Sequence, residues 1–166
     1  MTTHIDDAGR RMASPRPSIG RGMLVWTLRI ALGAVLLYAG VLKAADPAVF
    51  AREVAGYQFF PTLAPLIAAT LPTTELLLGL LLLILPSRSP WLRAAALATA
   101  AVFFMFLIAV TQVVVRGIDT RCGCFGADSG VVDMLSILRV AGFLVASVLL
   151  LLLTAPRHSK TNPSSP

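Results

Sequence analysis

Four long apolar segments dominate the chain and limit what it can fold into. They cover residues 24–42, 63–85, 91–115 and 134–154. Each is close to the ~20 residues that a helix needs to cross ~30 Å of hydrocarbon. A soluble domain of 166 residues, 57% of them hydrophobic and 13% charged, could not bury this much apolar surface. The sequence therefore predicts an all-α, polytopic membrane protein: a bundle of four transmembrane helices with short loops, in contact with a lipid bilayer.

The segments outside this bundle are polar. Residues 1–22 and 156–166 are predicted to be disordered tails, and the membrane domain is predicted to span residues 23–155. The first apolar segment has a competing interpretation as a secretory signal, because basic residues precede it. Lys43 stands two positions before Ala45, where a cleavage site requires a small residue. A retained membrane span is therefore expected.

The distribution of Lys and Arg predicts the orientation. The two tails and the second loop carry eight of these residues, whereas the first and third loops carry four, namely Lys43, Arg52, Arg116 and Arg121. Because basic residues accumulate on the cytoplasmic side, both termini are predicted to be cytoplasmic and the third loop extracytoplasmic, in the cytoplasmic membrane. The net charge of +6 flanks the apolar segments instead of forming a patch, so no nucleic-acid partner is expected.

Both cysteines of the chain, Cys122 and Cys124, lie two residues apart in the third loop. A disulfide between them would close a ring of three residues and stabilise the fold by only about 1.5 kcal/mol before strain is subtracted. Strained bridges exchange readily. Three interpretations stay open: redox exchange, a local structural bridge, or half of a metal site shared with another chain. The neighbours predicted to support a redox loop are Arg121, Gly123, Phe125 and Gly126.

Several polar residues fall inside the apolar segments. Glu75 lies near the middle of the second segment, where an unpaired carboxylate is costly, so Arg29 or Arg139 is expected to pair with it. Arg139 is predicted to lie at a depth close to that of Thr111 and Gln112. These side chains could form a pocket that positions the loop, a quinone or a partner's thiol. Alternatively, the charges form a buried ion pair that fixes the helix register.

Small residues in three of the segments are expected to let the helices approach closely in lipid. They are Gly33, Gly40, Ala94, Ala98, Gly142 and Ala146. Aromatic residues before Pro61, among them Tyr57, are expected to anchor a short helix at the membrane boundary.

Three stretches of the chain carry a resemblance to a known family. They are residues 38–46 (YAGVLKAAD), residues 71–79 (LPTTELLLG), and Arg116-Gly117 together with residues 122–126 (CGCFG). In these stretches the chain resembles the MauE/DoxX-like integral membrane proteins, and most closely the methylamine-utilisation (MauE) type. The likeness covers residues 23–155, and CGCFG is its most specific part.

The resemblance implies a membrane protein that assists the maturation of an exported redox enzyme, beside an extracytoplasmic thioredoxin-like partner. For the MauE type, the implied client is the disulfide-rich small subunit of methylamine dehydrogenase. Carried over by position, Cys122 and Cys124 would be the exchanging pair, and Glu75 and Arg139 the membrane-embedded acid and base. Whether the pair turns over as a thiol-disulfide oxidoreductase stays open at this point.

Other functional classes compete with this one. A non-catalytic assembly factor or quinone-binding subunit of a membrane oxidoreductase, as in DoxX-type proteins, would make the cysteines structural. A transporter is a weaker alternative, because a chain of 166 residues would have to form a homodimer to supply inverted repeats. The sequence has no metal, nucleotide or flavin motif, and quinone is the one candidate cofactor.

Overall fold

The computed structural model describes residues 19–58, 61–118 and 132–155. Over these residues it contains no strand and four helices long and apolar enough to cross a membrane. These are α2 (Ile19–Ala45), α4 (Ala64–Ile84), α5 (Pro90–Val115) and α6 (Met134–Thr154). The short helix α3 (Pro47–Gly56) and the 3-10 turn η1 (Pro61–Leu63) connect α2 to α4. The predicted four-span, all-α fold is confirmed.

Helices α3 and α5 start at the same local signal, a polar residue followed by proline. The Asp46 side chain accepts a hydrogen bond of 3.0 Å from the backbone N–H of the third residue of α3, after Pro47. The Ser89 hydroxyl accepts one of 3.2 Å from the second residue of α5, after Pro90. Each cap accepts a hydrogen bond from a backbone N–H group that has no partner within the first turn. Proline has no N–H group, so it leaves no donor unsatisfied at its position. The sequence thus fixes where α3 and α5 begin.

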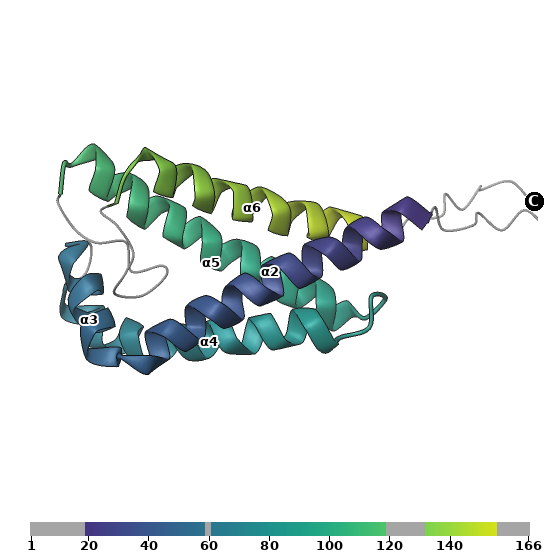
Figure 1. The fold of residues 1–166 in the computed structure, drawn as a ribbon, viewed down its shortest axis with the longest axis horizontal. Helices are drawn as coiled ribbons and strands as arrows, with labels where there is room; N and C mark the ends of the chain where they lie inside the picture. Colours follow the sequence, from purple (N-terminus) through teal and green to yellow (C-terminus); the bar gives the residue numbers. More distant parts are fainter. Residues whose placement is uncertain (1–18, 59–60, 119–131, 156–166) are drawn as a thin grey trace, which may run out of the picture.

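The long helices pack in two adjacent pairs, α2 with α4 and α5 with α6 (Figure 1). Their facing sides form the main apolar core, made of Val25, Leu32, Leu36, Leu78, Leu82, Leu92, Ala95, Ala96, Phe103 and Leu150. The opposite sides expose large apolar residues, for example Leu77, Leu97 and Val145. Because water would oppose that exposure, the outer surface is suited to lipid. The protein is a multi-pass membrane protein.

The two ends of the bundle differ in character. At one end lie the start of α2, the connection from α4 to α5 and the last turn of α6, with Arg21, Arg29, Arg88 and Arg93; we call it the arginine end. The opposite end carries α3, and we call it the α3 end. In Figure 1 the α3 end is on the left and the arginine end on the right.

Two predicted boundaries need correction. Helix α2 begins at Ile19, inside the predicted tail 1–22, and continues to Ala45 instead of stopping at residue 42. Both extensions contain a basic residue that the apolar pattern placed outside the span, Arg21 and Lys43. Inside the fold, each of these side chains hydrogen-bonds to another helix, so helix continues through it. The predicted disorder of residues 1–18 and 156–166 lies outside the described residues and stays a prediction.

Candidate functional site

Helix α2 presents one face with a seven-residue repeat to α4. Arg29, Leu36 and Lys43 follow one another at this spacing, and so do Gly33 and Gly40. All five residues are buried. A seven-residue repeat keeps one side of a helix against its neighbour over many turns. The face therefore carries two cations and two glycines along one line of contact with α4.

The glycines bring the two backbones into contact. A Cβ atom on Gly33 would lie 3.2 Å from the carbonyl oxygen of Gly79, and one on Gly79 would lie 3.0 Å from the carbonyl oxygen of Gly33. The expected role of the small residues of α2 is thus confirmed. Three small residues of the other helices were also expected to allow close helix contacts, and this expectation is wrong. Ala94, Ala98 and Gly142 are exposed and so are not buried in a helix contact.

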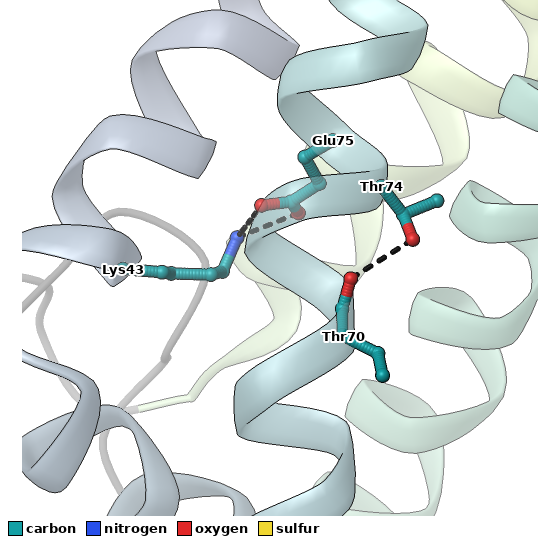
Figure 2. Close-up of polar contacts among 4 residues, drawn as sticks. All are labelled: Lys43, Thr70, Thr74 and Glu75. Carbon is teal, nitrogen blue, oxygen red and sulfur yellow. Dashed lines mark hydrogen bonds and ion pairs between the residues drawn. The ribbon is translucent and has the colours of Figure 1, made fainter.

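Lys43 and Glu75 form a buried ion pair between α2 and α4 (Figure 2). Lys43 Nζ lies 2.7 Å from Oε1 and 2.8 Å from Oε2 of Glu75, and each side chain is 1% exposed. The ring centroids of Phe50 and Phe106 lie 5.6 and 5.4 Å from Nζ, within the range of a cation–π contact. A cavity of about 20 Å³ adjoins the pair, enough for about one water molecule.

Two threonine hydroxyl groups near Glu75 on α4, those of Thr70 and Thr74, take no part in this pair. Thr74 donates to the carbonyl oxygen of Thr70 at 2.9 Å (Figure 2), and Thr70 donates to that of Leu66 at 2.9 Å. Both hydroxyls are therefore satisfied within their own helix, as is common for threonine in a membrane. The carboxylate of Glu75 depends on Lys43.

The predicted partner of Glu75, Arg29 or Arg139, is wrong. Glu75 pairs with Lys43. Helical side chains tilt toward the N-terminus of their own helix. Lys43, in the last turn of α2, therefore reaches back toward the membrane centre. Glu75 lies on the antiparallel α4, so its side chain leans toward Lys43. The apolar pattern gave no sign of this, because it ended the span at residue 42.

Arg29 has a different set of partners. Its Nε donates to the carbonyl oxygen of Leu82 at 2.7 Å, its Nη2 donates to those of Leu83 and Leu85, and its Nη1 donates to the Ser87 hydroxyl at 2.9 Å. The residue is 1% exposed. Carbonyl groups in the last turn of a helix lack intrahelical partners. Arg29 therefore caps the C-terminal end of α4 from the neighbouring helix.

The residues that flank the cysteine-bearing third loop are firmly placed. Gly117 follows α5 with a φ of 62°, and the N–H groups of Gly117 and Ile118 donate to the carbonyl oxygens of Val114 and Val113 at 3.2 and 3.1 Å. This pair of hydrogen bonds is the Schellman motif, which favours glycine at the positive φ. On the other side of the loop, Val132 is buried against Val113, in a cluster that Ile118 also joins. The loop therefore leaves and re-enters the fold at one apolar cluster.

Two polar contacts brace this region at the α3 end. Gln112 of α5 donates to the carbonyl oxygen of Tyr57 at 2.6 Å and accepts from Arg116 at 3.0 Å, which ties the end of α3 to α5. Asp133 caps α6 by accepting from the backbone N–H and the hydroxyl of Ser136, each at 2.9 Å. These hydrogen bonds hold the pKa of the Asp133 carboxyl below its ordinary value. The predicted short helix near Tyr57 is present as α3.

The remaining predicted site residues are distributed as follows. Arg139 is exposed on α6, and Gln112 is engaged with Tyr57, so the structure does not bring them together with Glu75 in one site. Within the described residues, no group of three His, Cys, Asp or Glu side chains could hold a metal ion. The cysteine-loop residues fall outside the described residues: Arg121, Cys122, Gly123, Cys124, Phe125 and Gly126.

Comparison with known proteins decides the family. The family model described as methylamine utilisation protein MauE matches residues 21–153. The chain belongs to this family. The match covers all four membrane-spanning helices and the cysteine loop, so the MauE resemblance noted in the sequence is confirmed. No curated protein and no solved structure matches the chain. The protein is thus a multi-pass membrane protein of the methylamine-utilisation type.

Proposed function

We propose that this MauE-family protein is the membrane component of an extracytoplasmic thiol-disulfide pathway that assists the maturation of an exported redox enzyme. Cys122 and Cys124 would be the exchanging pair, and a thioredoxin-like protein would be its partner. In the methylamine case the client would be the disulfide-rich small subunit of methylamine dehydrogenase. The observation that carries the proposal is that both cysteines of the chain fall within one loop of the family's membrane domain.

The packing of the α3 end supports the proposal. Ile118 and Val132, the described residues on either side of the loop, meet in one apolar cluster, and the caps at Gly117 and Asp133 fix the adjacent helix ends. Lys43 and Glu75 hold α2 and α4 together below this region. An exchange loop benefits from a rigid base, because the partner then meets the thiols at a defined position.

The charge distribution supports an extracytoplasmic position for the loop. The two tails and the second loop carry eight Lys and Arg residues, whereas the first and third loops carry four, and no acidic residue occurs among the described positions of the arginine end. By the positive-inside rule that end, with both chain termini, would face the cytoplasm, and α3 and the cysteine loop would face the opposite side. Disulfides persist in oxidising compartments outside the cytoplasm.

The proposed exchange conserves electrons and protons. The thiolate of reduced Cys122 attacks the partner's disulfide, so a mixed disulfide forms and one partner sulfur leaves as thiolate. Cys124 then attacks the Cys122 sulfur and releases the second partner thiolate. The products are a Cys122–Cys124 disulfide and a reduced partner dithiol, with two electrons transferred. The reverse sequence oxidises the partner, and a quinone or another thiol protein would then take the electrons.

Trapping the mixed disulfide tests the proposal. Cells that express wild-type protein, Cys124→Ala or Cys122→Ala are quenched with acid, and free thiols are alkylated in native membranes. Cys124→Ala is expected to accumulate a reductant-sensitive adduct through Cys122, because the resolving thiol is missing. Cys122→Ala is the matched control and is expected to accumulate much less.

The redox state of the wild-type pair supplies the opposing result. If the pair stays fully oxidised under buffers that reduce ordinary exchange proteins, and no adduct forms in either variant, the cysteines are structural. The protein would then be a non-catalytic assembly subunit, and the exchange function would be wrong.

A further inference from the structure

A large cavity opens at the arginine end, at the opposite end of the bundle from the α3 end. Its volume is about 550 Å³. The start of α2, the α4–α5 connection, the first turn of α5 and the last turn of α6 enclose it, and Arg21, Trp26, Ser87, Arg88, Arg93 and Thr154 are among its lining residues. This volume falls in the range of ligand sites, roughly 300–1,000 Å³. The proposed function gives this cavity no role.

The charges around the cavity are all of one sign. Three of its lining residues are arginines, and none is acidic. Of the acidic residues that the structure describes, Asp46, Glu53 and Asp133 belong to the α3 end, and Glu75 is paired with Lys43. No carboxylate in the described part of the chain therefore offsets these guanidinium groups.

Two of the arginines make no hydrogen bond that would hold the described part of the fold together. Arg21 donates to the carbonyl oxygen of Leu153 in α6, whereas the exposed Arg88 and Arg93 make no hydrogen bond within the described residues. Arg93 is also the fourth residue of α5, near the positive end of that helix's dipole, where a cation is disfavoured. A bound anion would relieve that repulsion and occupy the free donors.

The position of the cavity identifies the source of the anion. Trp26, 51% exposed, stacks on Arg29 with 4.7 Å between the guanidinium carbon and the ring centroid, and Trp91 is 73% exposed at the same end. Exposed tryptophans at helix ends are typical of the headgroup region of a bilayer. Val25 and Leu153 provide apolar walls where the cavity meets the helices. A ligand with a phosphate and acyl chains matches this combination of surfaces.

We propose that the cavity is a binding site for the headgroup of an anionic phospholipid, with Arg88 and Arg93 as the phosphate-binding residues. The acyl chains extend along the apolar surfaces of α2 and α6 into the bilayer. Basic cavities between transmembrane helices bind anionic headgroups by this chemistry. The site does not depend on the cysteine pair or on any redox role of the protein.

Native mass spectrometry of the purified full-length protein tests this site. In nonionic detergent the protein is titrated with phosphatidylglycerol and, separately, with phosphatidylcholine. Phosphatidylglycerol is expected to bind at least tenfold more tightly. Because each arginine near a lipid surface contributes roughly a fivefold change in affinity, the double variant Arg88→Gln/Arg93→Gln is expected to lose about 30-fold for phosphatidylglycerol. Its affinity for phosphatidylcholine is expected to stay unchanged.

The matched control removes two exposed arginines from the α3 end. Arg52→Gln/Arg116→Gln has the same net charge as the test variant and is expected to bind phosphatidylglycerol like the wild type. An equal loss in both double variants would mean diffuse surface attraction and would overturn the proposal, as would wild-type binding by Arg88→Gln/Arg93→Gln. Inorganic phosphate at millimolar concentration should not displace the lipid; displacement would identify a site for free phosphate instead. If the double variant fails to fold, Arg93→Gln alone is expected to lose about fivefold.

Discussion

Arg29 and Lys43 occupy corresponding positions on α2, yet they are neutralised in different ways. Both are buried cations on the same face of the helix, and both reach α4. They are 14 residues apart, which is ~21 Å along a helix. Arg29 donates to backbone carbonyls at the end of α4, whereas Lys43 donates to the carboxylate of Glu75.

The difference follows from the shapes of the two groups. A guanidinium is a planar fork with five N–H donors, so it can satisfy several carbonyls of a helix end together. An ammonium is a compact charge that matches one carboxylate. The consequence reaches beyond the two contacts. Carbonyls leave the positive charge of Arg29 formally uncompensated, and Glu75 cancels that of Lys43. The arginine end therefore stays cationic while the α3 end is close to neutral.

The largest expected effect comes from breaking the Lys43–Glu75 pair on one side. Glu75→Met leaves a buried ammonium without a counter-charge, and Lys43→Met leaves a buried carboxylate. Each change is expected to lower the free energy of unfolding by about 3–5 kcal/mol. The double variant Lys43→Met/Glu75→Met is expected to return to within about 1 kcal/mol of the wild type, because both charges are gone. Unfolding by SDS in mixed micelles measures all three variants.

This thermodynamic cycle has a clear opposing outcome. If the effects of the two single substitutions simply add in the double variant, the coupling energy is zero and the ion pair does not form in the membrane. A large recovery of the free energy of unfolding in the double variant would show that the single variants lose stability because one charge is left unpaired. Methionine at both positions restores none of the hydrogen bonds of the pair.

Arg29 is expected to respond differently to the same kind of test. Arg29→Met should lower the free energy of unfolding by about 1.5–3 kcal/mol, less than the loss at Lys43, because it removes charged hydrogen bonds but leaves no buried charge. No second substitution is expected to restore the loss, since the acceptors are backbone carbonyls. Ser87→Ala, which removes one side-chain acceptor, is the control and should cost little. If a nearby apolar substitution restored the free energy of unfolding of Arg29→Met, the capping role would be contradicted.

The sequence predicted the fold well and the polar contacts poorly, for one physical reason. The length of an apolar segment directly determines whether it can span the membrane, so the predicted segment 134–154 matches α6 at both ends. The same pattern does not show which neighbouring residue a polar side chain contacts. Lys43 was counted in a loop and Arg29 was assigned to Glu75, because only the packing of α2 on α4 shows which way each side chain extends. The 14-residue separation of Arg29 and Lys43, which is two seven-residue repeats, was present in the sequence and would have placed them on one face.

The close approach of α2 and α4 at Gly33 and Gly79 lies between the two buried cations, and disturbing it is expected to have the smallest effect. It also gives the sharpest test of the comparison. Gly79 lies between Glu75 and Leu82 on α4, and a Cβ there would lie 3.0 Å from the carbonyl oxygen of Gly33. Gly79→Ala is expected to lower the free energy of unfolding by about 1–2 kcal/mol, because a backbone atom cannot move aside as a side chain can. Gly142→Ala is the matched control: no heavy atom lies within 4 Å of its added methyl group, so it should be neutral or gain up to about 1 kcal/mol of helix propensity. If α2 and α4 form one rigid contact, Gly79→Ala will couple energetically to Glu75→Met and to Arg29→Met alike. Coupling to only one of them would mean that the two buried cations are held by independent halves of the helix pair.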